Sequence, residues 1–402
     1  MAVEKILVLN CGSSSVKYEL CSVSGETCLA KGEIEAVGCE GTILVHSHAD
    51  KKIKVPISAR DHTEAINEVV NILISSETGI IKNKSEINAV GHRIVHGGAY
   101  FKEPAIVTEE VKKKLEDCFE LAPLHTPHHL KGIMAIESIL PNIPQILVFD
   151  TAFHQTIPNY AHIYGLPYRF YEKYNIRKYG FHGISHQYVT EKLSQTVGVP
   201  ITDLKLISCH LGNGASVCAV LGGQSVDTSM GFTPLEGLMM GTRTGDMDPA
   251  VIPYLMSKDS LKPNEVQTLI NKQSGILGIS GISSDMRTVL DEYENGNSKA
   301  RLAIDMFCYR VKKYITSYIG VLNGADYIIF TAGIGERSPF IRGKILENLQ
   351  SLGIKISGKK NDLCVSNIAE ISADDSNVKV YVVPTNEAMV IARQTRILLD
   401  NM

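Results

Sequence analysis

The alternation of apolar and polar residues near the start of the chain predicts two strands joined by a tight turn. Lys5 to Asn10 is a short apolar run, and Val16 to Cys21 alternates more weakly after a turn rich in glycine and serine. Two more short strands are expected at Gly32 to Val37 and Thr42 to His46. The first helix is expected at about Thr63 to Ile74, where the apolar residues share one face.

From that helix onward, strand-like and helix-like patterns alternate along the chain. The clearest helix is Lys299 to Leu322, which has an apolar residue at every third or fourth position and is followed by Asn323-Gly324. Further strands are expected at Ile87 to Val95, Gln145 to Asp150, Leu204 to His210, Ser216 to Leu221, Gln224 to Ser229, Tyr327 to Thr331 and Val378 to Val383. This alternation predicts an α/β fold.

One pattern occurs twice, about 200 residues apart. The segments LVLNCGSSSVK at 7–17 and LISCHLGNGASVC at 206–218 both combine an apolar strand, a glycine-rich turn and a second strand. We interpret them as the matching hairpins of a duplicated domain, each with a turn whose backbone could bind an anion; two ordinary β-turns are the simpler alternative. Neither turn has the P-loop or the G-x-G-x-x-G pattern, so phosphate would have to be held by the hairpin turns themselves.

Composition and charge narrow the classes of partner. A chain of 402 residues is long enough for two domains or more. Its 40 Lys and Arg against 43 Asp and Glu give a net charge of −3, which does not suggest a protein that binds nucleic acid or a membrane surface. We therefore expect small-molecule partners.

The cysteines and the hydropathy indicate a cytoplasmic protein. The nine cysteines form no C-x-x-C pair, so we expect neither a disulfide framework nor a zinc ribbon. No apolar run approaches the roughly 18 residues of a membrane span, and the apolar stretch Ile6 to Leu9 is too short for a signal peptide.

The first hairpin carries candidate ligands for a phosphate and its metal ion. Asn10, Ser13, Ser14, Ser15 and Lys17 supply an amide, three hydroxyls and an ammonium group close to small residues. Serine is also common in turns for conformational reasons, so this hairpin is weak support by itself.

Two later strands end in charged residues. Arg93 and His96 lie in GHRIVHGG, where a strand runs into glycines, and Asp150 follows the apolar run Gln145 to Phe149. Open α/β sheets bind ligands at such strand ends. Asp150 is therefore a candidate partner of magnesium or of an arginine, although an Asp there could also cap the next element.

The remaining candidates lie in loops. His182 in YGFHGISH could donate to a phosphoryl oxygen, and the loop Asp227 to Asp248 could close Arg243 around an anion. The turns Ser280 to Arg287 and Thr331 to Glu336 have the small residues of a nucleotide site, and Glu387 could complete a Mg²⁺ shell or simply favour the start of a helix. The histidines near 125–129 lack acidic or cysteine partners, so we do not expect a structural metal there. Together these groups favour phosphoryl transfer.

The same motifs resemble those of the acetate kinase family almost from end to end. They are NCGSSSVK (10–17), GHRIVHGG (91–98), FDTAFHQT (149–156), YGFHGISH (179–186), HLGNGAS (210–216), DTSMGFTPLEGLMMGTRTGDMDP (227–249), SSDMR (283–287), FTAGIGE (330–336) and TNE (385–387). The resemblance implies two duplicated α/β domains of the actin-like ATPase (ribonuclease H-like) type, as in sugar kinases and heat-shock ATPases, with the nucleotide in the cleft between them. It implies residues 1–150 plus 388–402 as the N-terminal domain and 151–387 as the nucleotide-binding domain.

The resemblance also implies an activity. Members convert acetate and ATP to acetyl phosphate and ADP, reversibly and with Mg²⁺ (Mn²⁺ being a possible substitute), usually as homodimers. Asn10 and Glu387 would be the metal ligands, directly or through water, and Arg93, Asp150, His182 and Arg243 the catalytic groups. The implied nucleotide-binding residues are Ser13, Ser15, Lys17, His210, Leu211, Gly212, Asn213, Gly214, Asp285, Met286, Arg287, Gly333, Ile334, Gly335, Glu336 and Arg337.

By the same matching, Arg93 holds the substrate and Val95, Leu124, Phe181 and Pro234 form an acyl pocket that favours acetate over propionate or butyrate. Acetate is already ionised at pH 7, so we expect Asp150 to orient Arg93 or Mg²⁺ rather than to act as a base. Three residues depart from the family pattern, namely Thr126, Arg337 and Ala388, and Arg337 could change the nucleotide or donor preference.

Three alternatives remain open. A propionate or butyrate kinase differs only in the acyl pocket. An ATPase clamp of the actin or heat-shock type would hydrolyse ATP without an acyl acceptor, and would normally carry a peptide-binding or polymerising region, which we do not expect after Leu399. A catalytically silent nucleotide-binding subunit is disfavoured because the six catalytic and metal-binding candidates are all present.

Overall fold

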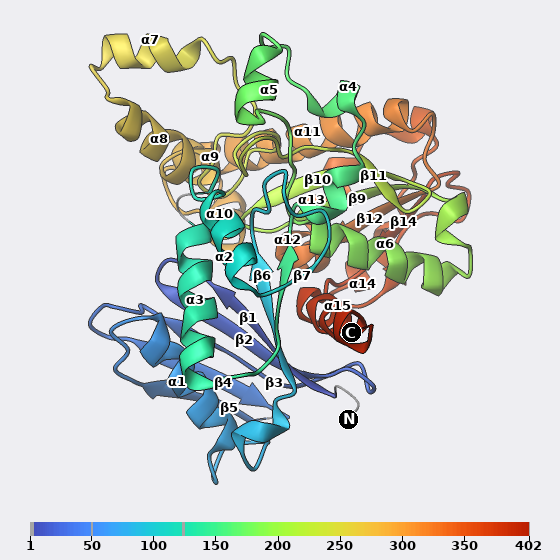
Figure 1. Cartoon of the computed structure of the whole chain (residues 1–402). Helices are drawn as coiled ribbons and strands as arrows, with labels where there is room; N and C mark the ends of the chain where they lie inside the picture. The colour runs from blue at the N-terminus through green and yellow to red at the C-terminus, as the bar shows by residue number, and fades with distance from the viewer. Residues whose placement is uncertain (1–3, 50, 123–124, 402) are drawn as a thin grey trace. The chain divides into compact units, whose positions relative to one another are not determined.

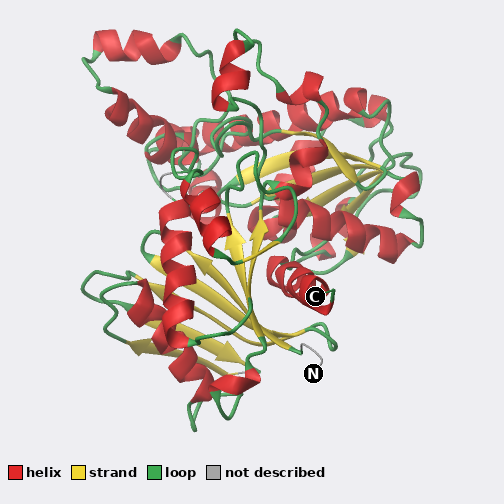
Figure 2. Ribbon diagram, in the orientation of Figure 1, coloured by secondary structure: helices red, strands yellow, loops and turns green. Residues whose placement is uncertain are grey.

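The computed structural model describes residues 4–49, 51–122 and 125–401, which form two compact units (Figures 1 and 2). The first unit comprises residues 1–152 and 386–402, and the second comprises residues 153–385. The chain therefore leaves the first unit once and returns to it for its final helix.

An eight-stranded sheet forms the centre of the first unit, with the strand order β5-β4-β3-β2-β1-β6-β8-β7. Strand β1 pairs antiparallel with β2 and parallel with β6, which pairs parallel with β8. The strands are β1 (Lys5–Cys11), β2 (Ser15–Ser22), β3 (Thr27–Glu35), β4 (Ile43–His48), β5 (Lys51–Pro56), β6 (Ala89–Ile94), β7 (Ala105–Ile106) and β8 (Gln145–Phe149).

Helices cover both faces of this sheet (Figure 1). Leu7 and Leu9 of β1 face a core shared with α1 (His62–Ile74) and α3 (Thr126–Ile139), while α2 (Glu109–Glu116) packs on α3. The final helix α15 (Glu387–Asp400) packs against β1, β6 and β8. A Cβ on Gly91 would lie 2.6 Å from Cγ2 of Ile391, so the glycine allows α15 to approach the sheet closely.

The second unit has a six-stranded sheet with the order β11-β10-β9-β12-β14-β13. Its strands are β9 (Lys205–Leu211), β10 (Ala215–Leu221), β11 (Gln224–Thr228), β12 (Tyr327–Thr331), β13 (Ala369–Glu370) and β14 (Lys379–Val382). Helices α6 (Gly183–Val197) and α11 (Ser298–Val321) pack against this sheet. The other helices are α4 (Asn159–His162), α5 (Arg169–Tyr174), α7 (Val251–Lys258), α8 (Pro263–Lys272), α9 (Gly275–Ser280), α10 (Met286–Glu294), α12 (Ala332–Arg337), α13 (Pro339–Leu346) and α14 (Gly358–Leu363).

The two sheets repeat one topology. The order β3-β2-β1-β6-β8 in the first corresponds to β11-β10-β9-β12-β14 in the second. In each, a hairpin and its next strand are antiparallel, and two parallel strands follow the first strand of the hairpin. The predicted α/β class is confirmed, and the shared order is what a duplicated domain would produce.

Within the described ranges, no helix is both long enough and apolar enough to cross a membrane.

Candidate active site

Arg93 and Asp150 meet at the carboxyl ends of two parallel strands in the first unit. Arg93 lies near the end of β6, and Asp150 directly follows β8, where its backbone N–H donates to the Ile94 carbonyl at 2.9 Å. Nε of Arg93 donates to Oδ1 of Asp150 at 3.0 Å, and Nη2 donates to Oδ2 at 2.8 Å. The remaining nitrogen, Nη1, lies 2.9 Å from Oε2 of Glu387, the first residue of α15. The two carboxylates therefore contact all three nitrogens of the guanidinium and hold it in one orientation.

The charges of this cluster support one another. Burial opposes the charge on Arg93, but the carboxylates of Asp150 and Glu387 outweigh this effect and raise the pKa of the guanidinium above its ordinary value. Asp150 is only 2% exposed, and both its oxygens accept from Arg93. These two hydrogen bonds explain the position of Asp150 without the alternative role of a helix cap.

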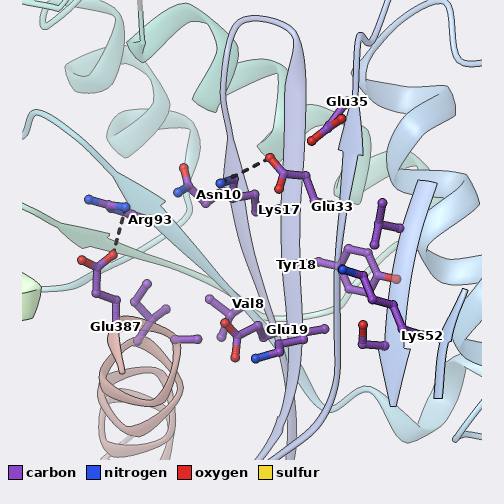
Figure 3. Close-up of a pocket in the computed structure, with 16 residues that line it drawn as sticks. Val8, Asn10, Lys17, Tyr18, Glu19, Glu33, Glu35, Lys52, Arg93 and Glu387 are labelled. Atoms are coloured by element: carbon purple, nitrogen blue, oxygen red, sulfur yellow. Dashed lines mark ion pairs between the residues drawn. The ribbon is translucent and has the colours of Figure 1, made fainter. Parts of the chain in front are cut away.

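A cavity of about 580 Å³ opens beside this cluster (Figure 3). Asn10, Lys17, Arg93 and Glu387 all line it. Asn10 and Lys17 are cross-strand partners in the β1–β2 hairpin, so both side chains project from the same face of the sheet. Ser13 lies in the turn of that hairpin and Ser15 begins β2, and the Gly12 N–H donates to the Ser15 carbonyl at 2.8 Å. Lys17 is 59% exposed and lies 3.3 Å from Glu33 on β3.

His182 and Arg243 converge on the second hairpin turn, in the second unit. His182 precedes α6 with a left-handed backbone (φ 58°), and Arg243 lies in the glycine-rich loop. A Cβ on Gly214 would lie 3.4 Å from Nε2 of His182 and 3.6 Å from Nη1 of Arg243. Glycine thus leaves open the space that both nitrogens face.

Arg243 has no counter-ion within the described part of the chain. Its Nη1 donates to the carbonyl of Pro234 at 2.8 Å and lies 3.5 Å from Sδ of Met240. Burial lowers the pKa of the guanidinium, although it stays charged at neutral pH. A largely buried cation without a carboxylate partner is unfavourable unless an anionic ligand completes it.

A second cavity, of about 520 Å³, lies next to the same turn. Gly212 and Asn213 of the turn form one side of it. The rest of its wall comes from the start of α10 and from α12, namely Ser284, Asp285, Met286, Arg287, Leu290, Gly333, Ile334, Arg337 and Ser338. Asp285 caps α10 and pairs with Arg287 across the cavity rim, whereas Arg337 forms no ion pair among the described residues.

Five of the sequence-predicted nucleotide residues of the second unit do not line this cavity, and one of them is Gly214 of the turn itself. His210 and Leu211 are buried at the end of β9, and Gly335 packs over Phe330. Glu336 points to the chain segment before α15, where its Oε1 accepts from the Thr385 N–H at 3.1 Å. Glu336 is therefore placed to hold the Thr385–Glu387 segment in position through this hydrogen bond.

The predicted acyl-pocket residues are only partly described. Leu124 lies outside the described residues. Val95 is half-buried just after β6 in the first unit. In the second unit, Phe181 is buried and its carbonyl bonds to His154, while Pro234 contacts Arg243.

The sequence matches proteins of one kind over nearly its whole length. It is 54% identical over 398 residues to an acetate kinase of Acetivibrio thermocellus, covering 99% of this chain and 100% of that protein. It is 51% identical over 397 residues to an acetate kinase of Methanosarcina thermophila, covering 98% and 97%. A profile of the acetokinase family matches residues 5–393. The chain belongs to the acetokinase family.

Solved structures agree with the acetokinase assignment. The crystal structure of the Porphyromonas gingivalis acetate kinase has a TM-score of 0.94 and 44% identity, covering 98% of this chain and 100% of that one. A propionate kinase from Francisella tularensis has a TM-score of 0.92 and 40% identity, covering 98% and 99%. The predicted family and its two-domain α/β fold are therefore confirmed, and this acetokinase is a phosphotransferase.

Several residues around the acetokinase site were not singled out from the sequence. Ser284, Leu290 and Ser338 line the second cavity, and Ser216 bonds to His182. Arg342 of α13 is fully buried behind α12, where it donates to the carbonyls of Gly335 and Glu336. Ser216 and Ser284 had a signal in the sequence, because they lie in the HLGNGAS and SSDMR motifs, whereas Leu290, Ser338 and Arg342 had none.

Proposed function

We propose that this acetokinase transfers the γ-phosphoryl group of ATP to a carboxylate oxygen of acetate, giving acetyl phosphate and ADP, and also runs in reverse. A P–O bond forms to acetate as the bond to the β-phosphate oxygen breaks, by direct in-line transfer. Arg243 carries the proposal, because its buried charge lacks a carboxylate partner in the described chain and faces the Gly214 turn together with His182. The identity of 54% to an acetate kinase supports acetate as the acceptor.

The chemistry requires two anions to approach each other. Acetate is ionised at pH 7 and needs no base, so positively charged and hydrogen-bond-donating groups must supply most of the catalysis. In our proposal Arg93, Arg243 and His182 bind the carboxylate and the transferring phosphoryl group. Asp150 holds the guanidinium of Arg93 in one orientation through its two hydrogen bonds.

Asn10 and Glu387 fit the proposed Mg²⁺ site, and Mn²⁺ is a possible substitute. Mg²⁺ in kinases commonly has one or two protein oxygen ligands, with water and phosphate oxygens completing its shell. Both side chains line the same cavity. Among the described residues, no group of three His, Cys, Asp or Glu side chains is clustered closely enough to hold a metal ion by itself. When bound, the ion would neutralise charge on the phosphates.

In the second unit, the proposed nucleotide-binding residues surround the 520 Å³ cavity, and the backbone at Gly212 to Gly214 would bind phosphates. In the first unit, we assign phosphate binding to Ser13, Ser15 and Lys17 of the first hairpin. Asp285 to Arg287 and Gly333 to Arg337 would bind the adenosine. Within this set, Glu336 would act indirectly, through its hydrogen bond to the Thr385 N–H. The second unit is accordingly the proposed nucleotide-binding domain.

Acetate is the preferred substrate in this proposal, and propionate is the runner-up. Val95, Leu124, Phe181 and Pro234 would surround the methyl group. One extra methylene changes binding by only about 1–3 kcal/mol, so propionate should be a poorer substrate rather than an excluded one. A propionate kinase at 40% identity keeps this alternative in view.

We further propose a cytoplasmic homodimer. All nine cysteines are free, which suits a reducing compartment. Analytical ultracentrifugation across a range of protein concentrations tests the dimer.

Trapping acyl phosphate as the hydroxamate tests the proposed reaction. Purified protein is incubated with Mg-ATP and either acetate, propionate or butyrate. We expect the largest product yield with acetate, loss of product in Arg243→Ala, and full yield in the matched control Arg169→Ala, which removes an exposed arginine of α5. ATP hydrolysis without hydroxamate from any acid would reject the proposal in favour of an ATPase.

A further inference from the structure

A continuous chain of hydrogen bonds runs behind His182 in the second unit. Oγ of Ser208 lies 2.9 Å from Nδ1 of His186, and Nε2 of His186 lies 2.8 Å from Oγ of Ser216. Oγ of Ser216 lies 2.9 Å from Nδ1 of His182. Ser208, His186 and Ser216 are each fully buried. The two serines project from β9 and β10 toward α6, which carries His186.

The protonation of His186 limits how this chain can be arranged. Burial lowers the pKa of His186 well below its ordinary value, so the ring is neutral and carries one N–H. Either Ser208 donates to His186 and every later bond points toward His182, or every bond points the other way. A third arrangement, in which Ser216 accepts from both rings, would leave its own hydroxyl hydrogen without an acceptor, because His182 and His186 are the only side-chain hydrogen-bond partners of Ser216 among the described residues.

The position of Ser208 distinguishes these two directions. Among the described residues, its hydroxyl has no hydrogen-bond partner other than His186. If the chain pointed toward Ser208, that hydroxyl would accept from His186 and its own hydrogen would be buried without an acceptor. Such a group costs about 1–3 kcal/mol. If Ser208 donates, each hydrogen in the chain has an acceptor.

We propose that Ser216 is a positioning residue that donates its hydroxyl hydrogen to Nδ1 of His182 and so keeps the ring proton of a neutral His182 on Nε2. This inference rests on the proposed role of His182 at the transferring phosphoryl group. Nε2 of His182 and Nη1 of Arg243 both border the space that a Cβ on Gly214 would occupy. This series of hydrogen bonds thereby makes Nε2 of His182 a hydrogen-bond donor, rather than a lone pair, toward an anion in that space.

The stacking of His182 on His210 strengthens this assignment. The two rings are 4.1 Å apart at their centroids and 21° from parallel. Nδ1 of His210 is hydrogen-bonded to Oγ of Ser185 at 2.8 Å, and that hydroxyl donates to Thr385 at 2.9 Å. A separate series of hydrogen bonds, through Ser185 and Thr385, thus holds the His210 ring in place, and the His182 ring can stack on it.

Nitrogen NMR of the full-length enzyme labelled with ¹⁵N-histidine tests the tautomer directly. The chemical shifts of the ring nitrogens distinguish a protonated from an unprotonated nitrogen, and His182→Gln assigns the signal. We expect Nε2 of His182 to be protonated and Nδ1 to be unprotonated at neutral pH. A protonated Nδ1, in either the opposite tautomer or an imidazolium ion, would overturn the proposal. This measurement needs no substrate, so its outcome is separate from that of the acetate kinase assay.

Substitution of Ser216 tests its role in catalysis. In Ser216→Ala, Nδ1 loses its donor, so the two tautomers mix and kcat for acetyl phosphate formation should fall by roughly 10- to 100-fold. KM for acetate should change by less than about threefold, since the donor matters mainly in the transition state. Ser216→Thr, which keeps the hydroxyl, should restore most of the rate; Ser216→Cys keeps a weaker donor if threonine does not fit.

Ser225→Ala is the matched control. Ser225 is an equally buried serine of the same sheet, and its Oγ lies 2.8 Å from Nδ1 of His154, outside the chain to His182. We expect it to keep the wild-type kcat even if its melting temperature falls. An unchanged rate in Ser216→Ala, or a lower rate with the His182 nitrogen signals unchanged, would show that Ser216 is only a structural residue.

Discussion

Arg93 donates two parallel hydrogen bonds to Asp150, at 3.0 and 2.8 Å, from the end of one parallel strand to the end of the next. Both carboxylate oxygens are therefore committed to the guanidinium, in the fork-to-fork geometry that fixes orientation as well as distance. A carboxylate held in this way is suited to positioning a cation and poorly suited to accepting a proton from a substrate.

Asp150→Asn should lower kcat by roughly two orders of magnitude, because the neutral amide cannot accept both bonds and leaves Arg93 less well oriented. The loss should be the same between pH 6 and pH 9, since no proton acceptor has been removed. Steady-state rates across this range check it. Glu86→Gln, which removes a more exposed partner of Lys5, is the control. Recovery of the Asp150→Asn rate at high pH would indicate a general base instead.

Val95→Ala should increase kcat/KM for propionate relative to acetate by up to about tenfold, because it removes two methyl carbons from the proposed acyl pocket. The two kcat/KM values are measured side by side by hydroxamate formation. Val107→Ala, at another partly buried valine of the first unit, should leave the ratio unchanged. If the ratio is the same in Val95→Ala and in the wild type, Val95 does not limit acyl size.

Arg337→Asn should raise KM for ATP by roughly three- to tenfold and leave KM for acetate unchanged. Arg337 lines the second cavity without an ion pair in the described chain, so its charge is available to a polyanionic nucleotide. The difference between variant and wild type should shrink in high salt, which screens exposed charges. Arg301→Asn, on the surface of α11, is the control. Equal KM values for ATP would remove Arg337 from the nucleotide site.

Arg342→Lys should lower the free energy of unfolding by about 2–4 kcal/mol. Arg342 is fully buried, and its nitrogens donate five hydrogen bonds to the backbone of α12 and to Asn361 and Cys364. Lysine has only three donors and lacks the planar fork, so buried carbonyls lose their partners. Urea unfolding checks the prediction, with the half-exposed Arg310→Lys as control. KM for ATP should rise as well, because α12 forms part of the nucleotide cavity.

Stability should decrease as the pH falls from about 6.5 to 4. Burial lowers the pKa of His92 and of His154 to about 4, whereas an unfolded histidine has a pKa near 6.5. The unfolded chain therefore binds more protons in this window, and each such histidine adds a slope of up to about 1.4 kcal/mol per pH unit. Above pH 7 these groups contribute no slope.

Urea midpoints between pH 4 and pH 8 test this pH dependence. His92→Gln should flatten the slope by about one proton, and His48→Gln, on the partly exposed end of β4, should not. A midpoint that is constant or rises toward pH 4 would show that the buried histidines are not neutral in the folded state.

The strands that were predicted from the sequence are those with apolar runs. Tyr327–Thr331 was predicted residue for residue, and the hairpin strands were correct to within two residues. Strand β5 was missed because Lys51, Lys52 and Lys54 hide its pattern. It is the edge strand of its sheet, where lysines discourage pairing with another chain.

The residues of the candidate site likewise fall into two groups, those that apolar runs pointed to and those that they did not. Arg93, Asp150 and Glu387 stood out because each ends or follows an apolar strand, and the structure brings them together. The chain through Ser208, His186 and Ser216 was not predicted, because it depends on cross-strand register and on how α6 lies over the sheet. Ser216 is opposite His210 in the β9–β10 pairing, a relationship that sequence spacing alone does not reveal.

The return of α15 to the first unit has a consequence for how the protein folds during synthesis. Strands β1 and β6 are made early, but α15, which covers one face of them, follows all 233 residues of the second unit along the chain. Until the ribosome has produced those residues, the apolar face around Val8 and Gly91 lacks its cover. The nascent first unit must therefore persist in an incomplete state that exposes this face to chaperones and to other nascent chains.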